Sequence, residues 1–277
     1  MTRPRVSAVV ICCDEADRIG DCLASVAWCD EVLVVDSGSR DGTLAIARAH
    51  ATRVFERAWP GYVAQKNFAL EQATGEWVLC LDADERCSAA LRLAVEAAVA
   101  SDSPLVGYRV KRHTFHLGRW IEHGGWYPDW KLRLVRRGRA RWGGVDPHDQ
   151  LIADGPVGRL DADLEHFSYR DYADQLRTVQ RFSDLVAEQW ARQGRRFSPW
   201  RALLHPPVKF LECWLWKQGF RDGWPGFVIA ATSSFYVFAK HVKLWERTAR
   251  RQERGRVGSV NFSPEGEKLT DPTRPLS

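Results

Sequence analysis

The chain has 277 residues, with 40 Lys or Arg against 35 Asp or Glu and a net charge of +5. This length allows one domain with a hydrophobic core and an appendage, and so modest a charge gives no general reason to expect a nucleic-acid partner. Seven cysteines without framework spacing, and no signal sequence before the first apolar run, exclude a disulfide-stapled secreted protein and predict a reduced, cytosolic one.

Short apolar runs alternate with amphipathic segments over the first hundred residues. The runs at 6–11, 31–35 and 77–81 are rich in β-branched residues without polar alternation, which is typical of strands buried on both faces of a parallel sheet. Residues at helical spacing lie between them, and Ser88 is placed to cap the last helix. Gly75 follows a helix expected to end near Thr74, where a left-handed residue is favoured. The predicted class is α/β, with helices on both faces of a mostly parallel sheet.

Two of these strands end at carboxylates. Asp36 follows the run 31–35, and Asp82-Ala83-Asp84 follows the run 77–81. Ligands of doubly wound sheets bind outside the carboxyl ends of the strands, so we expect these side chains to share one site. Two carboxylates one residue apart suit a ribose hydroxyl and a hard cation such as Mg²⁺ or Mn²⁺, which usually bridges nucleotide phosphates. The triplet alone also occurs on ordinary solvated turns.

Three motifs in order carry a family resemblance. They are the stretch from Val34 to Thr43 (VVDSGSRDGT), Gln65-Lys66-Asn67, and the stretch from Gly75 to Glu85 (GEWVLCLDADE). Together they resemble family 2 of the inverting glycosyltransferases, whose fold is called GT-A. The subgroup most resembled is the bacterial lipopolysaccharide core β-1,4-glucosyltransferases. The resemblance implies a GT-A domain over residues 1–170, with a nucleotide-sugar half (1–105) and an acceptor and catalytic half (106–170).

The same resemblance assigns roles on the donor side. Asp36 is implied to recognise the uracil base. Lys66 would lie one helix later in the chain, from where its side chain is expected to reach the nucleotide. Asp84 would hold the Mg²⁺ or Mn²⁺ ion, with Asp82 helping through the ribose or the metal. His166, from a late strand, would complete the coordination of the metal, although a lone histidine near a strand end is also a common structural residue.

An inverting transfer needs one general base near the acceptor hydroxyl and no protein nucleophile. By the resemblance, Asp149 in the stretch from Gly143 to Asp149 (GGVDPHD) corresponds to the family's catalytic glutamate, with one methylene less. Asp146 is the alternative base. Glu85 is another candidate, either as base or as a group supporting the site.

A basic and aromatic stretch runs from Arg109 to Trp142, with ten Lys or Arg residues among four further Trp or Tyr residues. Such a stretch is seen in nucleic-acid binding proteins. Beside the three motifs it indicates a groove for an anionic, sugar-containing acceptor, because indole rings stack on sugars and guanidinium groups bind phosphates. The other interpretation is a solvated strand pair in which Lys131, Arg133 and Arg136 point outward.

The composition changes at about Asp171. An amphipathic helix is expected from Tyr172 to Trp190, and an aromatic-rich segment follows. The uncharged run from Gly226 to Ala239 has fourteen residues, fewer than the roughly eighteen needed to span a bilayer, and a basic stretch follows it. We expect a helical, membrane-interfacial region over 171–247 and a basic, disordered tail over 248–277. A helical cap packed on the catalytic domain is the alternative for the first of these.

These observations predict an inverting, metal-dependent hexosyltransferase, peripheral on the cytoplasmic side of a bacterial inner membrane. It would move a hexose, glucose in the resembled subgroup, from a UDP-sugar to a lipid-linked glycan, the heptose of the lipopolysaccharide inner core. A polyprenyl-phosphate sugar synthase would share every donor motif. A nucleotidyltransferase would need a glycine-rich phosphate loop that is absent at 6–19. A catalytically inert membrane-associated scaffold is the alternative from another class.

Overall fold

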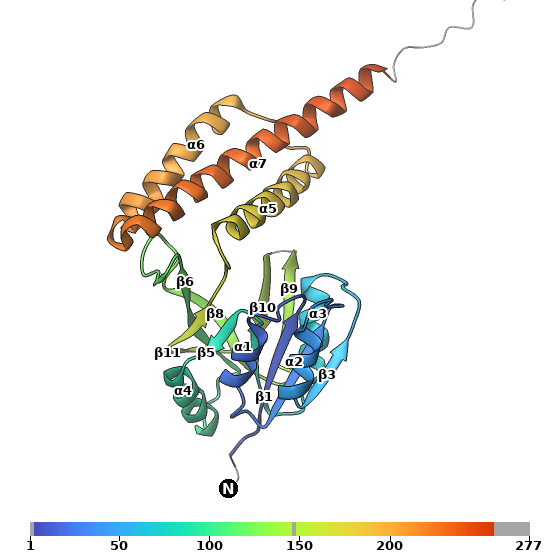
Figure 1. Cartoon of the computed structure of the whole chain (residues 1–277), viewed down its shortest axis with the longest axis vertical. Helices are drawn as coiled ribbons and strands as arrows, with labels where there is room; N and C mark the ends of the chain where they lie inside the picture. Colours follow the sequence, from blue (N-terminus) through green and yellow to red (C-terminus); the bar gives the residue numbers. More distant parts are fainter. Residues whose placement is uncertain (1–2, 146–147, 258–277) are drawn as a thin grey trace, which may run out of the picture.

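The computed structural model describes residues 3–145 and 148–257. A sheet with nine strands in this part of the chain forms the centre of the N-terminal domain, in the order β3-β2-β1-β4-β8-β6-β11-β5 with β7 paired to β6 (Figure 1). Its first half is parallel and consists of β1 (Val6–Cys12), β2 (Glu31–Asp36), β3 (Arg53–Glu56) and β4 (Trp77–Asp82). The predicted α/β class is confirmed.

The second half of the sheet is mixed. It contains β5 (Glu85–Cys87), β6 (Gly107–His116), β7 (Arg119–Trp120), β8 (Asp129–Arg136) and β11 (Val157–His166). β8 runs antiparallel to both β4 and β6, and β11 lies parallel to β6. A separate hairpin is formed by β9 (Ala140–Val145) and β10 (His148–Ala153).

Two hydrophobic cores hold the layers together. Helices α1 (Ile19–Ser25), α2 (Thr43–His50) and α4 (Ala89–Ala100) pack on one face of the sheet. Helix α3 (Tyr62–Gln72) and the β9–β10 hairpin cover the other face. The parallel strands are therefore covered on both sides, which is why their sequences are continuously apolar.

Local signals set two helix boundaries. The Ser88 side chain accepts a hydrogen bond from the Leu91 amide at 3.1 Å, so the predicted cap of α4 is present. Helix α3 instead ends at Gln72, and Gly75 has no left-handed backbone, so that prediction was wrong. Gly75 is needed for space, because a Cβ there would lie 2.8 Å from the Ser7 amide nitrogen.

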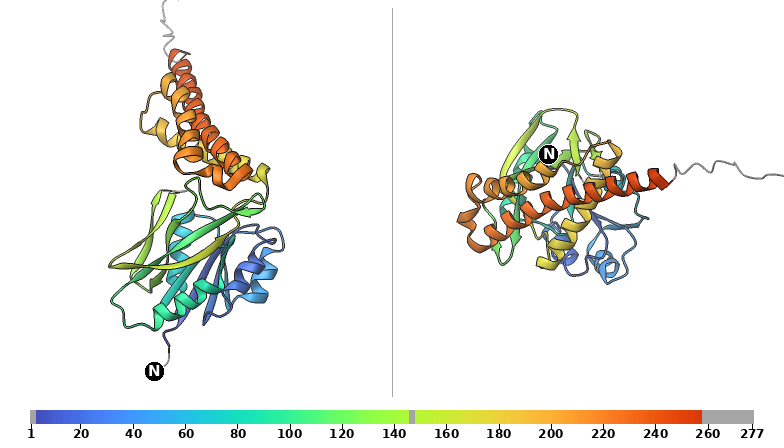
Figure 2. Two further views of the ribbon diagram at one scale, coloured as in Figure 1. Left: turned by 90° about the vertical axis from the view of Figure 1, so that its left-hand side faces the viewer. Right: turned by 90° about the horizontal axis from the view of Figure 1, so that it is seen from above.

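The C-terminal part is a helical unit that lies over one end of the sheet (Figures 1 and 2). It consists of α5 (Tyr172–Arg192), α6 (Pro199–Leu211), the short helices η1 (Glu212–Trp216) and η2 (Gly219–Asp222), and α7 (Gly223–Val257). α7 continues past the predicted start of the tail at residue 248, and residues 258–277 lie outside the described chain. Among the described residues no helix is both long enough and apolar enough to cross a membrane.

Candidate active site

The carboxyl ends of β1, β2 and β4 face the helical unit, and several of the predicted site residues lie at or just after these strand ends (Figure 1). At the end of β1, Ile11 is paired with Asp82 and Cys12 with Asp36. β5 follows β4 after a tight turn, and its first residue, Glu85, is paired with His166 at the end of β11. Residues from both halves of the sequence therefore meet around the turn that contains Asp84.

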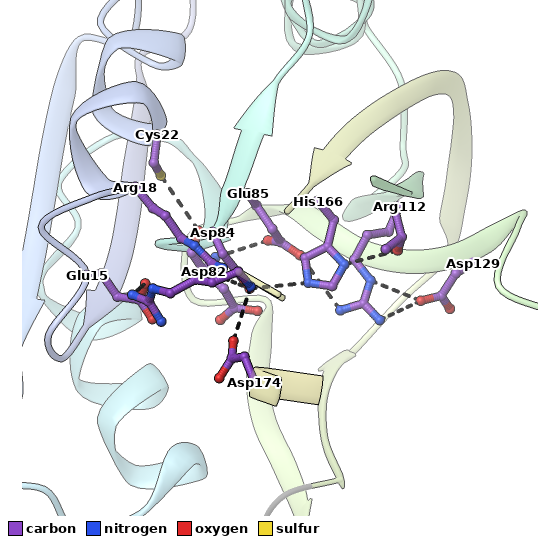
Figure 3. Close-up of polar contacts among 12 residues, drawn as sticks. Glu15, Arg18, Cys22, Asp82, Asp84, Glu85, Arg112, Asp129, His166 and Asp174 are labelled. Carbon is purple, nitrogen blue, oxygen red and sulfur yellow. Dashed lines mark hydrogen bonds and ion pairs between the residues drawn. The ribbon is translucent and has the colours of Figure 1, made fainter. Parts of the chain in front are cut away.

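Asp84 and His166 form a pair at this edge (Figure 3). The Asp84 Oδ2 atom lies 3.4 Å from His166 Nε2, and Arg18 Nη1 lies 3.9 Å from the same oxygen. The Thr114 hydroxyl is 3.1 Å from His166 Nδ1 and fixes the ring from behind. The Phe167 amide donates to the Asp84 carbonyl, which ties the two strand ends together.

These two residues fit a divalent ion that arrives with a nucleotide diphosphate. Within residues 3–145 and 148–257 no three His, Cys, Asp or Glu side chains are grouped closely enough to hold a metal alone. Mg²⁺ in nucleotide sites is commonly held by one or two protein ligands, with phosphate and water oxygens supplying the rest. A carboxylate beside an imidazole is a donor set that also accepts Mn²⁺.

Asp82 does not join this pair, although the sequence suggested it as a ligand. Its Oδ1 atom lies 2.9 Å from Lys66 Nζ, and its Oδ2 atom accepts from Arg133 at 2.9 Å. Burial alone would raise the pKa of the Asp82 carboxyl, but the two cations outweigh it and hold that pKa far below its usual value. Asp82 is thus a permanent anion between two cations.

Lys66 connects Asp82 to the predicted base. Its ammonium lies 3.0 Å from Asp149 Oδ2 and 4.5 Å from the ring centre of Trp142. Burial favours a lower pKa for Lys66, but the Asp82 and Asp149 carboxylates raise it above its usual value, so the side chain stays charged. Asp146 and the side chain of His148 lie outside the described atoms, so the alternative base is not placed.

The hairpin that carries Asp149 is anchored to α3. Asn67 Nδ2 donates to the Trp142 carbonyl at 2.9 Å, and the Trp142 amide donates back to Asn67 Oδ1 at 2.8 Å. This reciprocal pair fixes β9 against the helix that carries Lys66. The Gln65-Lys66-Asn67 motif therefore supplies both the lysine that pairs with Asp149 and the asparagine that anchors the hairpin carrying Asp149.

Arg133 is a site residue that sequence analysis missed. It is buried, and one nitrogen, Nη2, donates both to Asp82 and to Glu85 Oε1, the latter at 2.6 Å. Tyr108 on β6 is paired with Leu134 and Arg109 with Leu132, so Arg133 is the extra residue of a β-bulge. A bulge redirects a side chain, and this one turns Arg133 inward, so the alternative of a solvated strand pair does not hold for Arg133.

Glu85 is fully buried and supports the turn. Its Oε2 atom accepts from the Asp82 amide at 3.0 Å, and Arg112 lies 3.9 Å from Oε1 (Figure 3). Arg112 donates through two nitrogens to Asp129 Oδ2, at 2.7 and 3.0 Å. A carboxylate enclosed in this way cannot reach an acceptor hydroxyl, so Glu85 is a positioning group and not the base.

Asp36 differs from its predicted orientation. It is buried, and its Oδ2 atom accepts from the amides of Gly38 and Ser39 at 2.9 Å. The Ser39 hydroxyl and the Cys12 thiol donate to the other oxygen. The carboxylate holds the loop after β2 in shape through these four hydrogen bonds, and its predicted contact with the uracil base stays a prediction.

Arg170 closes one rim of the site. It donates to Glu15 Oε2 at 2.9 Å and to Asp17 at 2.8 Å, which ties the loop after β1 to the segment that enters α5. Burial raises the pKa of Glu15 to about 7, against the opposing effect of Arg170. In the sequence, Arg170 comes four residues after His166, and that position is the one signal that could have indicated its role.

Comparison with known proteins agrees with this geometry. The profile described as "Glycosyl transferase family 2" matches residues 7–151. The chain is 33% identical to the lipopolysaccharide core biosynthesis glycosyltransferase LpsC of Rhizobium meliloti, over 88% of this chain and 93% of that protein. It is 27% identical to the uncharacterized glycosyltransferase RT0209 of Rickettsia typhi, over 93% and 92% of the two chains.

The fold also has a solved counterpart. The mannosyltransferase PcManGT from Pyrobaculum calidifontis, determined in complex with GDP-Man and Mn²⁺, superposes with a TM-score of 0.50 and 20% sequence identity. The match covers 88% of each chain. At this identity the similarity concerns the arrangement of the strands and helices.

Proposed function

The chain belongs to glycosyltransferase family 2, and on that premise we propose that it transfers a hexose from a UDP-sugar to a lipid-linked glycan with inversion at the anomeric carbon. One observation carries the proposal: Lys66 links Asp149 of the β9–β10 hairpin to Asp82, and the Asp84–His166 pair lies at the turn that follows Asp82. A base and a metal-binding pair around one turn are the parts that an inverting transfer requires.

The residues have separable roles in this mechanism. Asp149 accepts the proton of the acceptor hydroxyl while the acceptor oxygen bonds to the anomeric carbon and the bond from that carbon to the diphosphate oxygen breaks. Lys66 holds the Asp149 carboxylate in place through the 3.0 Å ion pair. A divalent ion held by Asp84 and His166 would supply positive charge to the departing diphosphate. Glu85 and Arg133 keep the Asp82 turn in position.

The proposed acceptor is the lipopolysaccharide inner core, with heptose as the receiving sugar and glucose as the transferred one. Similarity to the Rhizobium meliloti core glycosyltransferase over most of both chains supports this choice. The three motifs support a UDP-sugar donor. The proposed location is the cytoplasmic surface of the inner membrane, where a lipid-linked acceptor would be presented. A polyprenyl-phosphate sugar synthase is the competing function, and it differs in the acceptor alone.

Calorimetric titration with UDP, GDP, ADP and CMP, each with Mn²⁺ and with a chelator, tests the donor half. We expect binding of UDP with Mn²⁺ and its loss with the chelator. Asp84→Ala should abolish the metal dependence. Asp161→Ala is the matched control, because Asp161-Ala162-Asp163 repeats the Asp-Ala-Asp triplet and Asp161 is exposed and paired with Lys111.

The outcomes separate the candidates. Binding of CMP or ADP in place of UDP would leave a transferase with another donor. Folded protein that binds no nucleotide would favour the inert scaffold. Once UDP binding is established, turnover of UDP-glucose on deacylated core oligosaccharide, compared with turnover on a polyprenyl phosphate, distinguishes the two acceptor classes.

A further inference from the structure

Large apolar side chains are exposed along one side of α6. Trp200, Leu203, Leu204, Val208 and Leu211 follow one another at helical spacing, and all are exposed, Trp200 by 71%. Ala202 and Pro206 are buried, and Ser234 of α7 donates to the Pro206 carbonyl at 2.8 Å, so α6 packs on α7 through its other side. The exposed stripe has no partner within the described part of the chain.

The stripe continues at the tip of the unit, where η1 leads into η2 and α7. Trp216 and Trp224 are 70% and 72% exposed. Trp224 stacks on Phe227 with ring centres 5.2 Å apart, and Phe227 contacts Phe210 of α6 at 5.6 Å. We call the α6 stripe together with Trp216 and Trp224 the outer face.

Some of the basic side chains beside the outer face are paired with a carboxylate, and others are not. Glu212 is paired with both Lys209 and Lys217, at 3.0 and 2.6 Å. Arg201 and Arg221 are exposed, and in the described chain neither has a carboxylate within 4 Å. Arg221 donates to Gln218 Oε1 at 2.8 Å, so its charge is hydrogen-bonded but not neutralised. Guanidinium groups without a carboxylate partner, next to exposed tryptophans, suit a surface that offers anions next to hydrocarbon.

Helix α6, which carries most of the outer face, lies on the side of the helical unit that is farther from the catalytic domain (Figures 1 and 2). α5 lies nearest the sheet and α6 lies on the far side of α7 (Figures 1 and 2). The carboxyl ends of β1, β2 and β4 face the same unit (Figure 1). A flat surface that covered the outer face would therefore lie on the same side of the catalytic domain as the carboxyl ends of β1, β2 and β4 (Figures 1 and 2).

We propose that the outer face docks on the surface of an anionic lipid bilayer and lies within its interface without crossing it. Trp and Leu insert at the level of the headgroups, where an indole keeps its N–H in a polar layer, and Arg201 and Arg221 contact anionic headgroups. The inference rests on the proposed function in one respect, since a lipid-linked acceptor gives this surface its use. A second copy of the chain would not need the uncompensated arginines.

Vesicle flotation of the full chain tests the docking. The probes are vesicles of phosphatidylcholine alone and of phosphatidylcholine with phosphatidylglycerol. The Leu204→Glu/Trp216→Glu variant should lose vesicle affinity by more than roughly tenfold, because two inserted apolar side chains are removed. Leu93→Glu/Trp59→Glu is the matched control, with one exposed Leu and one exposed Trp on the catalytic domain, and should float as the wild type does.

A second variant tests the charges. Arg201→Glu/Arg221→Glu should abolish most of the preference for vesicles with phosphatidylglycerol over neutral vesicles. Circular dichroism confirms that each variant is folded, and UDP binding is measured on the same samples. Vesicle docking without UDP binding would support this inference and contradict the proposed function. UDP binding without vesicle docking would support the proposed function and contradict this inference.

Three results would overturn the inference. The first is failure of the wild type to float with either vesicle, and the second is flotation of the outer-face variant equal to that of the wild type. The third is a lipid-free dimer, seen by light scattering, that Leu204→Glu/Trp216→Glu splits, since that would assign the face to a second copy.

Discussion

At the scale of single residues, Arg133 carries a charge that is buried, which costs free energy unless the charge is paired. A buried guanidinium is tolerated when carboxylates surround it, and removal of one member of such a group leaves uncompensated charge. Without Arg133, the carboxylates of Asp82 and Glu85 would lose this cation. Asp82 lies in the site, and Glu85 is fully buried. The stability of the fold and the shape of the donor site therefore depend on the same side chain.

Replacement of Arg133 by Met should lower the free energy of unfolding by about 3 kcal/mol, because two carboxylates lose their buried cation. Urea denaturation at neutral pH measures the change. Arg139→Met is the control, since Arg139 pairs with Asp154 at the surface and should cost less than about 1 kcal/mol. Equal losses in the two variants would show that Arg133 has no special structural role.

Asp149→Asn should reduce the transfer rate by roughly 10²- to 10⁴-fold, because an amide cannot accept the hydroxyl proton. UDP affinity should stay close to that of the wild type, since among the described residues Lys66 is the link between Asp149 and Asp82. Steady-state turnover and calorimetry on the same sample separate the two effects. The Asp146→Asn variant should keep its turnover. If Asp146→Asn loses turnover while Asp149→Asn stays active, Asp146 is the base.

Glu15 predicts a pH-dependent stability. Its pKa is raised by burial to about 7 from an ordinary value of 4.5, so the folded chain holds a proton that the unfolded chain has released between those values. This carboxyl therefore destabilises the fold progressively from about pH 4.5 to 7 and by a constant amount above, at most about 3 kcal/mol.

The Glu15→Gln variant removes that titration. Its free energy of unfolding relative to wild type should rise between about pH 4.5 and pH 7.5, as chemical denaturation at several pH values would show. A difference that stays constant with pH would contradict a raised pKa at Glu15. Asp17→Asn, on the same loop, is the control.

At the scale of elements, a buried junction joins the helical unit to the catalytic domain. Asp222 of η2 is fully buried and accepts from the His123 amide at 2.8 Å and from His123 Nδ1 at 3.0 Å. The Gly124 amide donates to the Lys217 carbonyl at 2.8 Å. The loop that follows β7 is thus fixed to η1 and η2 through paired backbone and side-chain contacts.

Replacement of Asp222 by Ala should open this junction, because several donors lose a buried acceptor, each at a cost of about 1–3 kcal/mol. Amide hydrogen exchange should accelerate at His123 and Gly124 while the protection of β1 and β4 is retained. Asp184→Ala on α5 is the control, since Asp184 is exposed and pairs with Lys243. Unchanged exchange at the two amides would show that other contacts carry the junction.

At the scale of the whole molecule, the proposed docking and the fixed junction together set the orientation of the site. If the helical unit holds the site toward the bilayer, loss of the outer face should reduce transfer to an acceptor in a membrane. Transfer to a free acceptor should not change. The two effects are separable because the outer face and the site residues lie on different elements (Figure 1).

The Leu204→Glu/Trp216→Glu variant should therefore lose most turnover on lipopolysaccharide core embedded in vesicles while it keeps turnover on deacylated core oligosaccharide. Parallel assays with the same UDP-sugar measure both activities, with Leu93→Glu/Trp59→Glu as control. Equal activity of the outer-face variant on both acceptors would show that docking does not serve catalysis.

The sequence by itself determined the class of fold and the edge at which the site lies. Continuous apolar runs, the Ser88 cap and carboxylates at strand ends are local signals, and the family motifs added the chemistry to them. The approach of Asp84 to His166 was also foreseeable, because both follow strands that end at the same edge.

Only the tertiary structure decided how the charges pair. Lys66 meets Asp149, 83 residues away, because Asn67 anchors the hairpin to α3. Arg133 turns inward because of a bulge that depends on the register between two strands, and Asp36 serves its own loop because a short turn brings amides to it. Local propensity specifies which segments are strands, whereas register and long-range packing choose the partner of each side chain, and those are properties of the assembled sheet.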